Sequence, residues 1–224
     1  MAEAKTRAAV MISGRGSNLE ALIAAAAQAH YPAEIALVLS NRADAKGLDH
    51  ARDHGIPTAI VDHAKASTKA EMEQKFDAAL RDAGIDLVCL AGFMRLLSAD
   101  FVAAWHDRIL NIHPSLLPLF PGLNTHERAL AAGVRVHGAT VHFVRAEMDA
   151  GPIIAQGAVP VLASDTPETL QQRVLRVEHL LYPLALSLVA SGEARVENDR
   201  VEISGIDGIA WTPDAALLSP PPPG

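Results

Sequence analysis

The sequence has little of what several classes of protein depend on. It contains a single cysteine, Cys89, so no disulfide can form within the chain, and only 4% of its residues are aromatic. Its 26 acidic residues outnumber its 19 Lys and Arg residues, and the formal net charge is -7 at pH 7. The longest apolar run, 180–190, contains a proline and is too short to cross a bilayer. We therefore expect neither a nucleic-acid-binding nor a membrane protein, but a cytoplasmic one.

The first half of the chain alternates apolar, β-rich runs with helical patterns. Strands are expected at 8–12, 34–40, 58–61, 87–90 and 108–111, and helices at 19–29, 47–54, 69–83 and 99–105. Continuous apolar strands separated by helices indicate a parallel sheet that is covered on both faces. The predicted fold class is therefore α/β, with a Rossmann-like, doubly wound, mostly parallel sheet. Cys89 lies within one of these apolar runs and is expected to be an inert core thiol.

The pattern changes after Pro114. Residues 138–144 and 153–161 predict antiparallel strands, and residues 195–203 predict a small hairpin. Thr166 suits the N-cap of a long helix that runs to about Ala190, with Pro167 at its first position. We expect one domain over 1–210, with halves at about 7–112 and about 113–203. The end of the chain, 211–224, finishes in SPPPPG and is expected to be a disordered tail.

The segment NIHPSLLP places two polar side chains at the end of a predicted strand. Asn111 and His113 are two residues apart, so they point to the same side of the strand, and Pro114 cannot continue it. An amide donor beside an imidazolium can stabilise an oxyanion. Asp149, in the turn sequence EMDAGP, offers a carboxylate that would favour the imidazolium. The alternatives are a structural histidine, the usual fate of a single His, and an ordinary Asx-turn aspartate.

No side-chain nucleophile or metal-ligand pattern accompanies these groups. The sequence has no G-x-S-x-G elbow, and His137 and His142 are not joined by an H-E-x-x-H or C-x-x-C motif. An amide, an imidazole and a carboxylate without either device suit direct acyl transfer through a tetrahedral intermediate.

A glycine-rich loop, SGRGSN at 13–18, joins the first predicted strand to the first helix. It begins like a dinucleotide fingerprint, but Leu19 replaces the third glycine. The second strand ends at Ser40-Asn41, without the acidic residue that would hold a ribose hydroxyl. The loop therefore predicts a cradle for one phosphate at a helix N-terminus. The alternative is a tight turn in which Ser or Asn caps the helix.

Several motifs resemble one known family when taken together. SGRGSNLEAL, LAGFMRLLS, LNIHPSLLP, FPGLNTHERAL, HGATVHFV and DAGPII occur in this order in glycinamide ribonucleotide formyltransferases, which the sequence resembles over roughly residues 7–190. The resemblance implies the formyltransferase fold, with an antiparallel C-terminal extension. It also implies formyl transfer from 10-formyltetrahydrofolate to the amine of glycinamide ribonucleotide, in purine biosynthesis, as a monomer or homodimer without a metal.

The resemblance also assigns roles to individual residues. It implies a catalytic group, which is Asn111, His113 and Asp149. It implies a ribonucleotide site, which is Gly16, Ser17, Asn18 and Glu178. It implies a folate site, which is Lys69, Met94, Arg95, Leu96, Leu97, Asn111, Arg145, Ala146, Glu147, Met148 and Asp149. From the resemblance and its place in a sharp turn, the Leu117–Pro118 bond is expected to be cis.

The sequence departs from the family pattern at a few of these positions. Lys69 stands where an arginine often contacts the folate, so a point charge replaces a forked contact. Arg15 and Ala150 replace a commoner asparagine and glycine. Simpler interpretations also exist for some of these residues. The apolar residues at 94–97 could be core residues, and Lys69 could be a solvated charge. Glu178 could be a salt-bridge partner of Arg173 or Arg176.

Three other functions compete with this one. Methionyl-tRNA formyltransferases share the NIHPSLLP segment but carry a further C-terminal RNA-binding domain. Formyltetrahydrofolate deformylases usually carry an N-terminal regulatory domain, whereas this sequence reaches its first predicted strand by Ala8. A non-catalytic ribonucleotide-binding module on the same fold is the third, and the intact Asn111, His113 and Asp149 argue against it.

Overall fold

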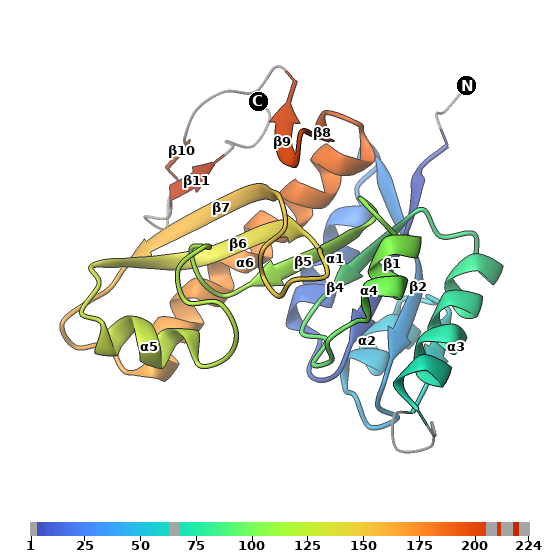
Figure 1. Cartoon of the computed structure of the whole chain (residues 1–224), viewed down its shortest axis with the longest axis horizontal. Helices are drawn as coiled ribbons and strands as arrows, with labels where there is room; N and C mark the ends of the chain where they lie inside the picture. The colour runs from blue at the N-terminus through green and yellow to red at the C-terminus, as the bar shows by residue number, and fades with distance from the viewer. Residues whose placement is uncertain (1–3, 63–67, 205–209, 212–216, 220–224) are drawn as a thin grey trace. The chain divides into compact units, whose positions relative to one another are not determined.

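The computed structural model describes residues 4–62, 68–204, 210–211 and 217–219 (Figure 1). The chain divides into two compact units, residues 1–111 and residues 112–224. The division falls near the boundary expected at residue 112. The grouping of both halves into a single domain stays a prediction.

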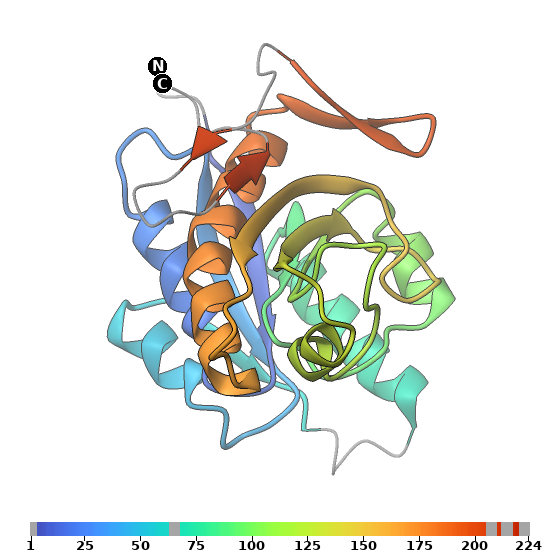
Figure 2. The same ribbon diagram turned by 90° about the vertical axis from the view of Figure 1, so that its left-hand side faces the viewer.

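The first unit is a parallel sheet with helices between its strands. Its strands are β1 (Thr6–Ile12), β2 (Ala33–Ser40), β3 (Thr58–Ile60), β4 (Leu87–Leu90) and β5 (Ile109–His113), whose last two residues belong to the second unit. Its helices are α1 (Ser17–Ala26), α2 (Gly47–Asp53), α3 (Lys69–Asp82) and α4 (Ala99–Ala104). The strand order is β5-β4-β1-β2-β3, with every described pair parallel. Figure 2 shows α1 and α2 on one side of these strands and α3 and α4 on the other.

Burial explains why these segments form central strands. The stretch 8–12 of β1 is fully buried, and so is Cys89 in β4, as expected of a core thiol. Side chains on both faces of such a strand must be apolar, because helices cover both faces. Polar caps start two of the helices: Thr68 accepts the Glu71 N–H at the start of α3, and Ser98 does the same for α4. The predicted doubly wound α/β class is confirmed.

The second unit is built on antiparallel strands and one long helix. Its strands are β6 (Val136–Phe143), β7 (Ile153–Pro160), β8 (Ala194–Glu197), β9 (Arg200–Ile203), β10 (Ala210–Trp211) and β11 (Leu217–Ser219), and its helices are α5 (Thr125–Ala131) and α6 (Pro167–Ala190). β6 pairs with β7, β7 with β11, and β8 with β9, all antiparallel. α6 packs against β6 and β7, and Figure 1 shows it crossing behind them. The predicted antiparallel extension is thus present.

The ends of α6 and the β8–β9 hairpin follow the sequence prediction closely. Thr166 is the N-cap, its hydroxyl accepts the Thr169 N–H, and Pro167 is the first helical residue. The hairpin turns at Asn198 and Asp199, which both have positive φ, as a type I′ turn requires. Helix α5 was not expected from the sequence, and its N-cap, Asn124, makes no side-chain hydrogen bond to the helix start.

The predicted disordered tail differs from the structure at some positions. Trp211 belongs to β10, and Leu217–Ser219 pair with β7, whereas 212–216 and 220–224 lie outside the described residues. The strand segment precedes the proline run, so each of its residues has an N–H to donate. The disorder expected for the remaining positions stays a prediction.

Two further observations concern single features. The Leu117–Pro118 peptide bond is cis, as expected. In the described part of the chain, no helix has the length and apolar character needed to span a membrane.

Candidate active site

The imidazole of His113, at the end of β5, is the centre of a buried polar cluster in the second unit. Its Nε2 lies 3.0 Å from the carbonyl oxygen of Phe120. A carbonyl only accepts hydrogen bonds, so Nε2 carries a proton and donates it. Its Nδ1 lies 3.5 Å from Oδ2 of Asp149, and the side chains are 8% and 10% exposed, respectively. Both ring nitrogens therefore have partners, and His113 and Asp149 come together as predicted.

Asp149 is held in place by a tight return of the chain after β6. It has a positive φ of 55°, an uncommon conformation for a residue with a side chain. Two residues later, a Cβ on Gly151 would lie 1.7 Å from the Phe143 carbonyl oxygen, so only glycine fits there. Oδ2 of Asp149 also accepts the Gly122 N–H at 2.8 Å. A backbone amide and an imidazole thus converge on one carboxylate, which is more than the simple Asx turn considered above.

A second imidazole, that of His142, lies beside the same carboxylate. Its Nδ1 donates to the Phe143 carbonyl at 2.9 Å, and its Nε2 lies 4.0 Å from Oδ1 of Asp149. Burial lowers the pKa of His142, while the carbonyl and Asp149 act in the opposite sense. The Phe143 carbonyl only accepts hydrogen bonds, so His142 carries a proton on Nδ1. Sequence reasoning weighed this residue only as a metal ligand and missed its place beside Asp149.

The loop 114–123 supplies two of the contacts described above, the Phe120 carbonyl and the Gly122 N–H. The loop is closed by its own hydrogen bond, from the Ser115 hydroxyl to the Leu119 carbonyl at 2.6 Å. The Phe120 ring packs edge-on against His137. Backbone groups leave no residue-type signature, so the sequence did not reveal that this loop links His113 to Asp149.

Asn111 occupies the position expected of it on β5. It is half-buried and precedes His113 by two residues on the same strand, so the two side chains point to the same side. Ile112, between them, points the other way and is 7% exposed.

The glycine loop of the first unit adopts a left-handed turn at its end. Gly16 is the N-cap of α1, with φ 82° and no side-chain hydrogen bond to the helix start. The alternative of a Ser or Asn cap is therefore wrong. A Cβ on Gly16 would lie 2.7 Å from the Cα of Gly47, and the Gly47 N–H donates to the Gly14 carbonyl at 3.0 Å. Ser17 is half-buried and Asn18 is 9% exposed at this helix start.

The residues expected at the folate site divide between the two units. In the first unit, Met94 and Leu96 are 69% and 66% exposed, so they are not core residues. Arg95 is also exposed, and Leu97 is half-buried. The side chain of Lys69 is 49% exposed, and its Nζ lies 3.9 Å from the buried carboxylate of Glu73.

In the second unit, the expected folate residues form the loop after β6. Ala146, Glu147 and Met148 are exposed. The guanidinium of Arg145 is turned toward Asp199 at 3.2 Å. Its charge therefore already has a partner in the β8–β9 turn.

Glu178, expected at the ribonucleotide site, is a buried carboxylate of α6. Arg173, one of the salt-bridge partners considered for it, instead pairs with Asp165 at 2.6 Å. This pairing lowers the pKa of Asp165 far below its usual range. Asp165 also accepts the Leu162 N–H, so it fastens the start of α6 rather than a ligand.

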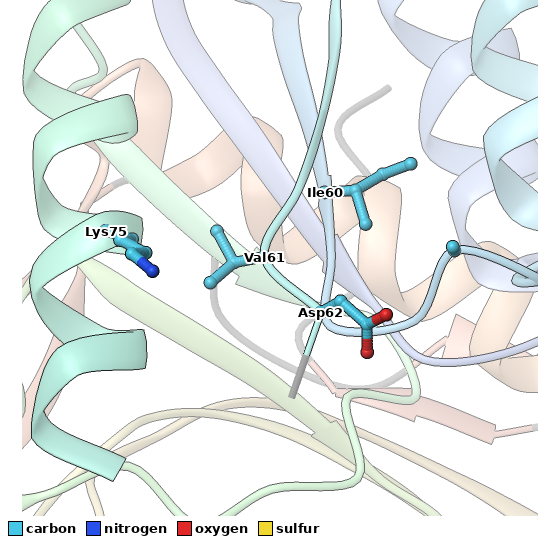
Figure 3. A pocket seen from close by; sticks show the side chains of 5 residues that line it. Ile60, Val61, Asp62 and Lys75 are labelled. Atoms are coloured by element: carbon cyan, nitrogen blue, oxygen red, sulfur yellow. The ribbon is translucent and has the colours of Figure 1, made fainter. Parts of the chain in front are cut away.

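One cavity of the first unit has a different lining. Its volume is about 390 Å³ and Figure 3 shows its lining, which comprises Ala43, Ile60, Val61, Asp62 and Lys75. None of the predicted site residues is among these. It lies at the end of β3 and carries no functional assignment. Among the described residues, no group of three or more His, Cys, Asp or Glu side chains is arranged to hold a metal ion.

These features define the class of protein. It is an α/β protein that offers a glycine loop at a helix start and a buried histidine–aspartate pair. The family model described as "Formyl transferase" matches residues 6–186. The chain therefore belongs to the formyl transferase family, and the resemblance noted in its motifs is confirmed.

Named relatives agree with this membership. The chain is 42% identical to phosphoribosylglycinamide formyltransferase of Escherichia coli over 88% of its length and 92% of that protein. It is 53% identical to the trifunctional purine biosynthetic protein adenosine-3 of Gallus gallus, over 86% of this chain but 19% of that protein. It thus spans about a fifth of the length of that larger relative. The crystal structure of glycinamide ribonucleotide transformylase 1 from Symbiobacterium toebii superposes with a TM-score of 0.86, at 47% identity, over 89% of this chain and 94% of that one.

Proposed function

We propose that this protein transfers the formyl group of 10-formyltetrahydrofolate to the amine of glycinamide ribonucleotide, as an enzyme of purine biosynthesis. The observation that carries the proposal is the buried His113–Asp149 pair, whose nitrogen and oxygen lie 3.5 Å apart, in a chain of this family. The match along 92% of the Escherichia coli phosphoribosylglycinamide formyltransferase supports glycinamide ribonucleotide as the acceptor.

The proposed reaction is direct transfer through a tetrahedral intermediate. The amine lone pair attacks the formyl carbon, and the electrons of the C=O π bond move to the oxygen. Collapse of the intermediate re-forms the C=O bond and breaks the bond between that carbon and N10 of the folate. N10 takes up one proton while the amine loses one, so charge and atoms balance.

In this proposal, Asn111 and His113 stabilise the oxygen as it becomes negative. The Asn111 amide and the His113 imidazolium each donate a hydrogen bond to it. Asp149 favours the imidazolium and accepts, directly or through a water, the proton that the amine releases. Because both nitrogens of His113 already have partners, donation to the substrate requires the ring to exchange one of them.

The remaining residues are proposed to bind the two substrates. Gly16, Ser17, Asn18 and Glu178 hold the ribonucleotide, with its phosphate at the start of α1. The uncapped start of α1 supports this, because its backbone N–H groups favour an anion. A further group is proposed to hold the folate, comprising Lys69, Met94, Arg95, Leu96, Leu97, Asn111, Arg145, Ala146, Glu147, Met148 and Asp149.

The proposal extends to the setting of the enzyme. The single cysteine supports a cytoplasmic location. Glycinamide ribonucleotide and 10-formyltetrahydrofolate are the proposed partners, the latter as co-substrate, and the enzyme acts as a monomer or homodimer.

The test is an assay of 10-formyltetrahydrofolate consumption with and without glycinamide ribonucleotide. We expect consumption only when the ribonucleotide is present, with formylglycinamide ribonucleotide and tetrahydrofolate formed in equal amounts. Consumption without the amine would identify a deformylase. No consumption under either condition would identify a non-catalytic binding module.

A further inference from the structure

The loop between β4 and α4, residues 92–98, is fastened at both ends by buried polar side chains of the first unit. Near its start, the Met94 N–H donates to the Ser13 hydroxyl at 2.9 Å. At its end, the N–H and the hydroxyl of Ser98 both donate to the carboxylate of Glu73, which is 5% exposed. Between the fastenings, Met94 and Leu96 are largely exposed. The loop is thus fixed through its backbone and presents its apolar side chains outward.

The donor and the acceptor of each hydrogen bond at the Ser13 hydroxyl can be assigned. A backbone amide only donates, so the Ser13 oxygen accepts from Met94. The Ser13 hydroxyl proton is then directed to Oδ1 of Asn41, at 2.6 Å. Ser13 is 7% and Asn41 2% exposed, so water does not substitute readily for either contact. Asn41 follows β2, where a dinucleotide-binding fold would carry an acid for a ribose hydroxyl. Here the side chain is turned inward and orients a serine.

Ser13 also begins the glycine loop, 13–18, but that loop does not depend on the Ser13 side chain. The glycine loop is fixed independently by contact with the start of α2. The Gly47 N–H donates to the Gly14 carbonyl, and Gly16 packs directly on the Gly47 backbone. Removing the Ser13 hydroxyl therefore frees the start of the 92–98 loop, whose end stays bonded to Glu73, and leaves the glycine loop in place.

We propose that Ser13, oriented by Asn41, is a positioning residue for the folate co-substrate. It sets the backbone of the 92–98 loop, which carries Met94, Arg95, Leu96 and Leu97 of the proposed folate site, and touches neither substrate itself. This inference rests on the proposed function, because that function makes the loop a folate site. It assigns to Ser13 a role in folate binding although Ser13 lies next to the proposed phosphate cradle.

The first test is the kinetics of Ser13→Ala with each substrate varied in turn. Losing one hydrogen bond that fixes the loop should raise the KM for 10-formyltetrahydrofolate about five- to tenfold. The KM for glycinamide ribonucleotide should change less than about twofold, because the glycine loop keeps its own contacts. Equal rises in both KM values, or an unchanged folate KM, would overturn the proposal.

A matched control is Ser40→Ala. The Ser40 hydroxyl is equally buried and donates to the Arg42 carbonyl at 2.8 Å, but it makes no described contact with the 92–98 loop. This variant loses a hydroxyl at a neighbouring strand end and should leave the folate KM unchanged. If Ser40→Ala raises the folate KM as much as Ser13→Ala does, the effect is general destabilisation and the proposal is wrong.

A double-mutant cycle tests whether Asn41 acts through Ser13. Asn41→Ala should raise the folate KM in the same direction, and Ser13→Ala combined with Asn41→Ala should cost little more than either change alone. Strictly multiplicative effects would show that the two residues act separately.

A second measurement does not depend on the reaction. Hydrogen exchange of the peptide covering 92–98, in the ligand-free protein, should be faster in Ser13→Ala than in the wild type and unchanged in Ser40→Ala. Unchanged exchange in Ser13→Ala would overturn the proposal. If the wild type shows no ribonucleotide-dependent transfer, the proposed function fails. Fluorescence titration with tetrahydrofolate then decides this inference, which survives only if the wild type binds and Ser13→Ala weakens binding about five- to tenfold.

Discussion

At the scale of single residues, the contacts of His113 define what the proposed chemistry requires. One ring nitrogen donates to the Phe120 carbonyl, and the other faces Asp149. Asp149 in turn accepts the Gly122 N–H, so a single loop restrains both members of the pair. The restraint keeps rotamer freedom small before substrate arrives, which is how positioned groups lower an activation barrier. Because one loop restrains both groups, a change to either the carboxylate or the imidazole should also disturb the position of the other.

Asp149→Asn should therefore lower kcat by at least about a hundredfold, the usual lower bound for losing a positioned acid or base. The amide keeps an oxygen for the Gly122 N–H but loses the negative charge that faces Nδ1 of His113. The KM for glycinamide ribonucleotide should change little, as steady-state kinetics with each substrate varied will show. Asp107→Asn is the matched control, since Asp107 also has positive φ and lies 3.2 Å from a histidine, His106. A decrease in kcat of less than about tenfold would show that Asp149 only shapes the turn and takes no part in catalysis.

Asn111→Ala should lower kcat by about two to three orders of magnitude, as the loss of one oxyanion donor does elsewhere. Because the interaction forms with the developing negative charge, kcat and kcat/KM should fall by similar factors. Steady-state kinetics on a variant shown by circular dichroism to be folded provides the measurement. A rise in KM with kcat unchanged would mean that Asn111 only binds ground-state substrate.

At the scale of elements, the glycine loop has two requirements that the sequence could not separate. Gly16 needs a left-handed conformation and backbone-to-backbone contact with Gly47 at the start of α2. Gly14 needs neither, because a Cβ there meets no atom within 4 Å. One glycine is therefore explained by packing, and the other is available to let a ligand approach.

Paired substitutions test this division. Gly16→Ala should destabilise the protein by about 1–3 kcal/mol, because the methyl group would overlap the Gly47 backbone in a strained conformation. Gly14→Ala should change the free energy of unfolding by less than about 1 kcal/mol and yet raise the KM for glycinamide ribonucleotide. Urea denaturation and steady-state kinetics of both variants give the comparison. An unchanged KM for glycinamide ribonucleotide in Gly14→Ala would show that the glycine loop is not part of the proposed phosphate site.

At the scale of the whole molecule, a buried histidine makes stability depend on pH. Burial lowers the pKa of His137 to about 4, with the neighbouring His126 adding to the effect. An unfolded chain would protonate this residue near pH 6.5. Between these values the unfolded state binds more protons than the folded state, so stability falls as the pH is lowered from about 6.5 to about 4.

His137→Phe should weaken that pH dependence. The phenyl ring keeps the packing against Phe120 but cannot take up a proton. The loss of unfolding free energy between pH 7 and pH 5 should shrink by about 2 kcal/mol relative to the wild type. Urea denaturation at pH 7 and pH 5 measures this loss. His54 is exposed, so the control variant His54→Gln should behave like the wild type. An identical pH dependence in wild type and His137→Phe would show that His137 does not titrate in this range.

Much of the architecture was predictable because its signals are local. The apolar runs of β1 and β4 must be buried on both sides, and Thr166-Pro167 specifies where α6 begins. Helix α5 was not predicted from the sequence, and its start at Asn124 has no side-chain cap that would mark it. The pairing of β11 with β7 was not predicted either. The three residues of β11 directly precede a proline run, and no pattern nearby in the sequence indicates which strand they pair with.

For the site, the sequence by itself determined which chemical groups are available: an amide and an imidazole two residues apart, an aspartate in a glycine-bearing turn, and no nucleophile. Only the tertiary structure decided which of them meet. The approach of Asp149 to His113 depends on the return of the chain at Gly151 and on a backbone N–H of Gly122. The inward turn of Asn41 onto Ser13 depends on two strand ends lying side by side. Such contacts join residues distant in sequence, often through backbone groups that every residue carries, so residue type alone does not encode them.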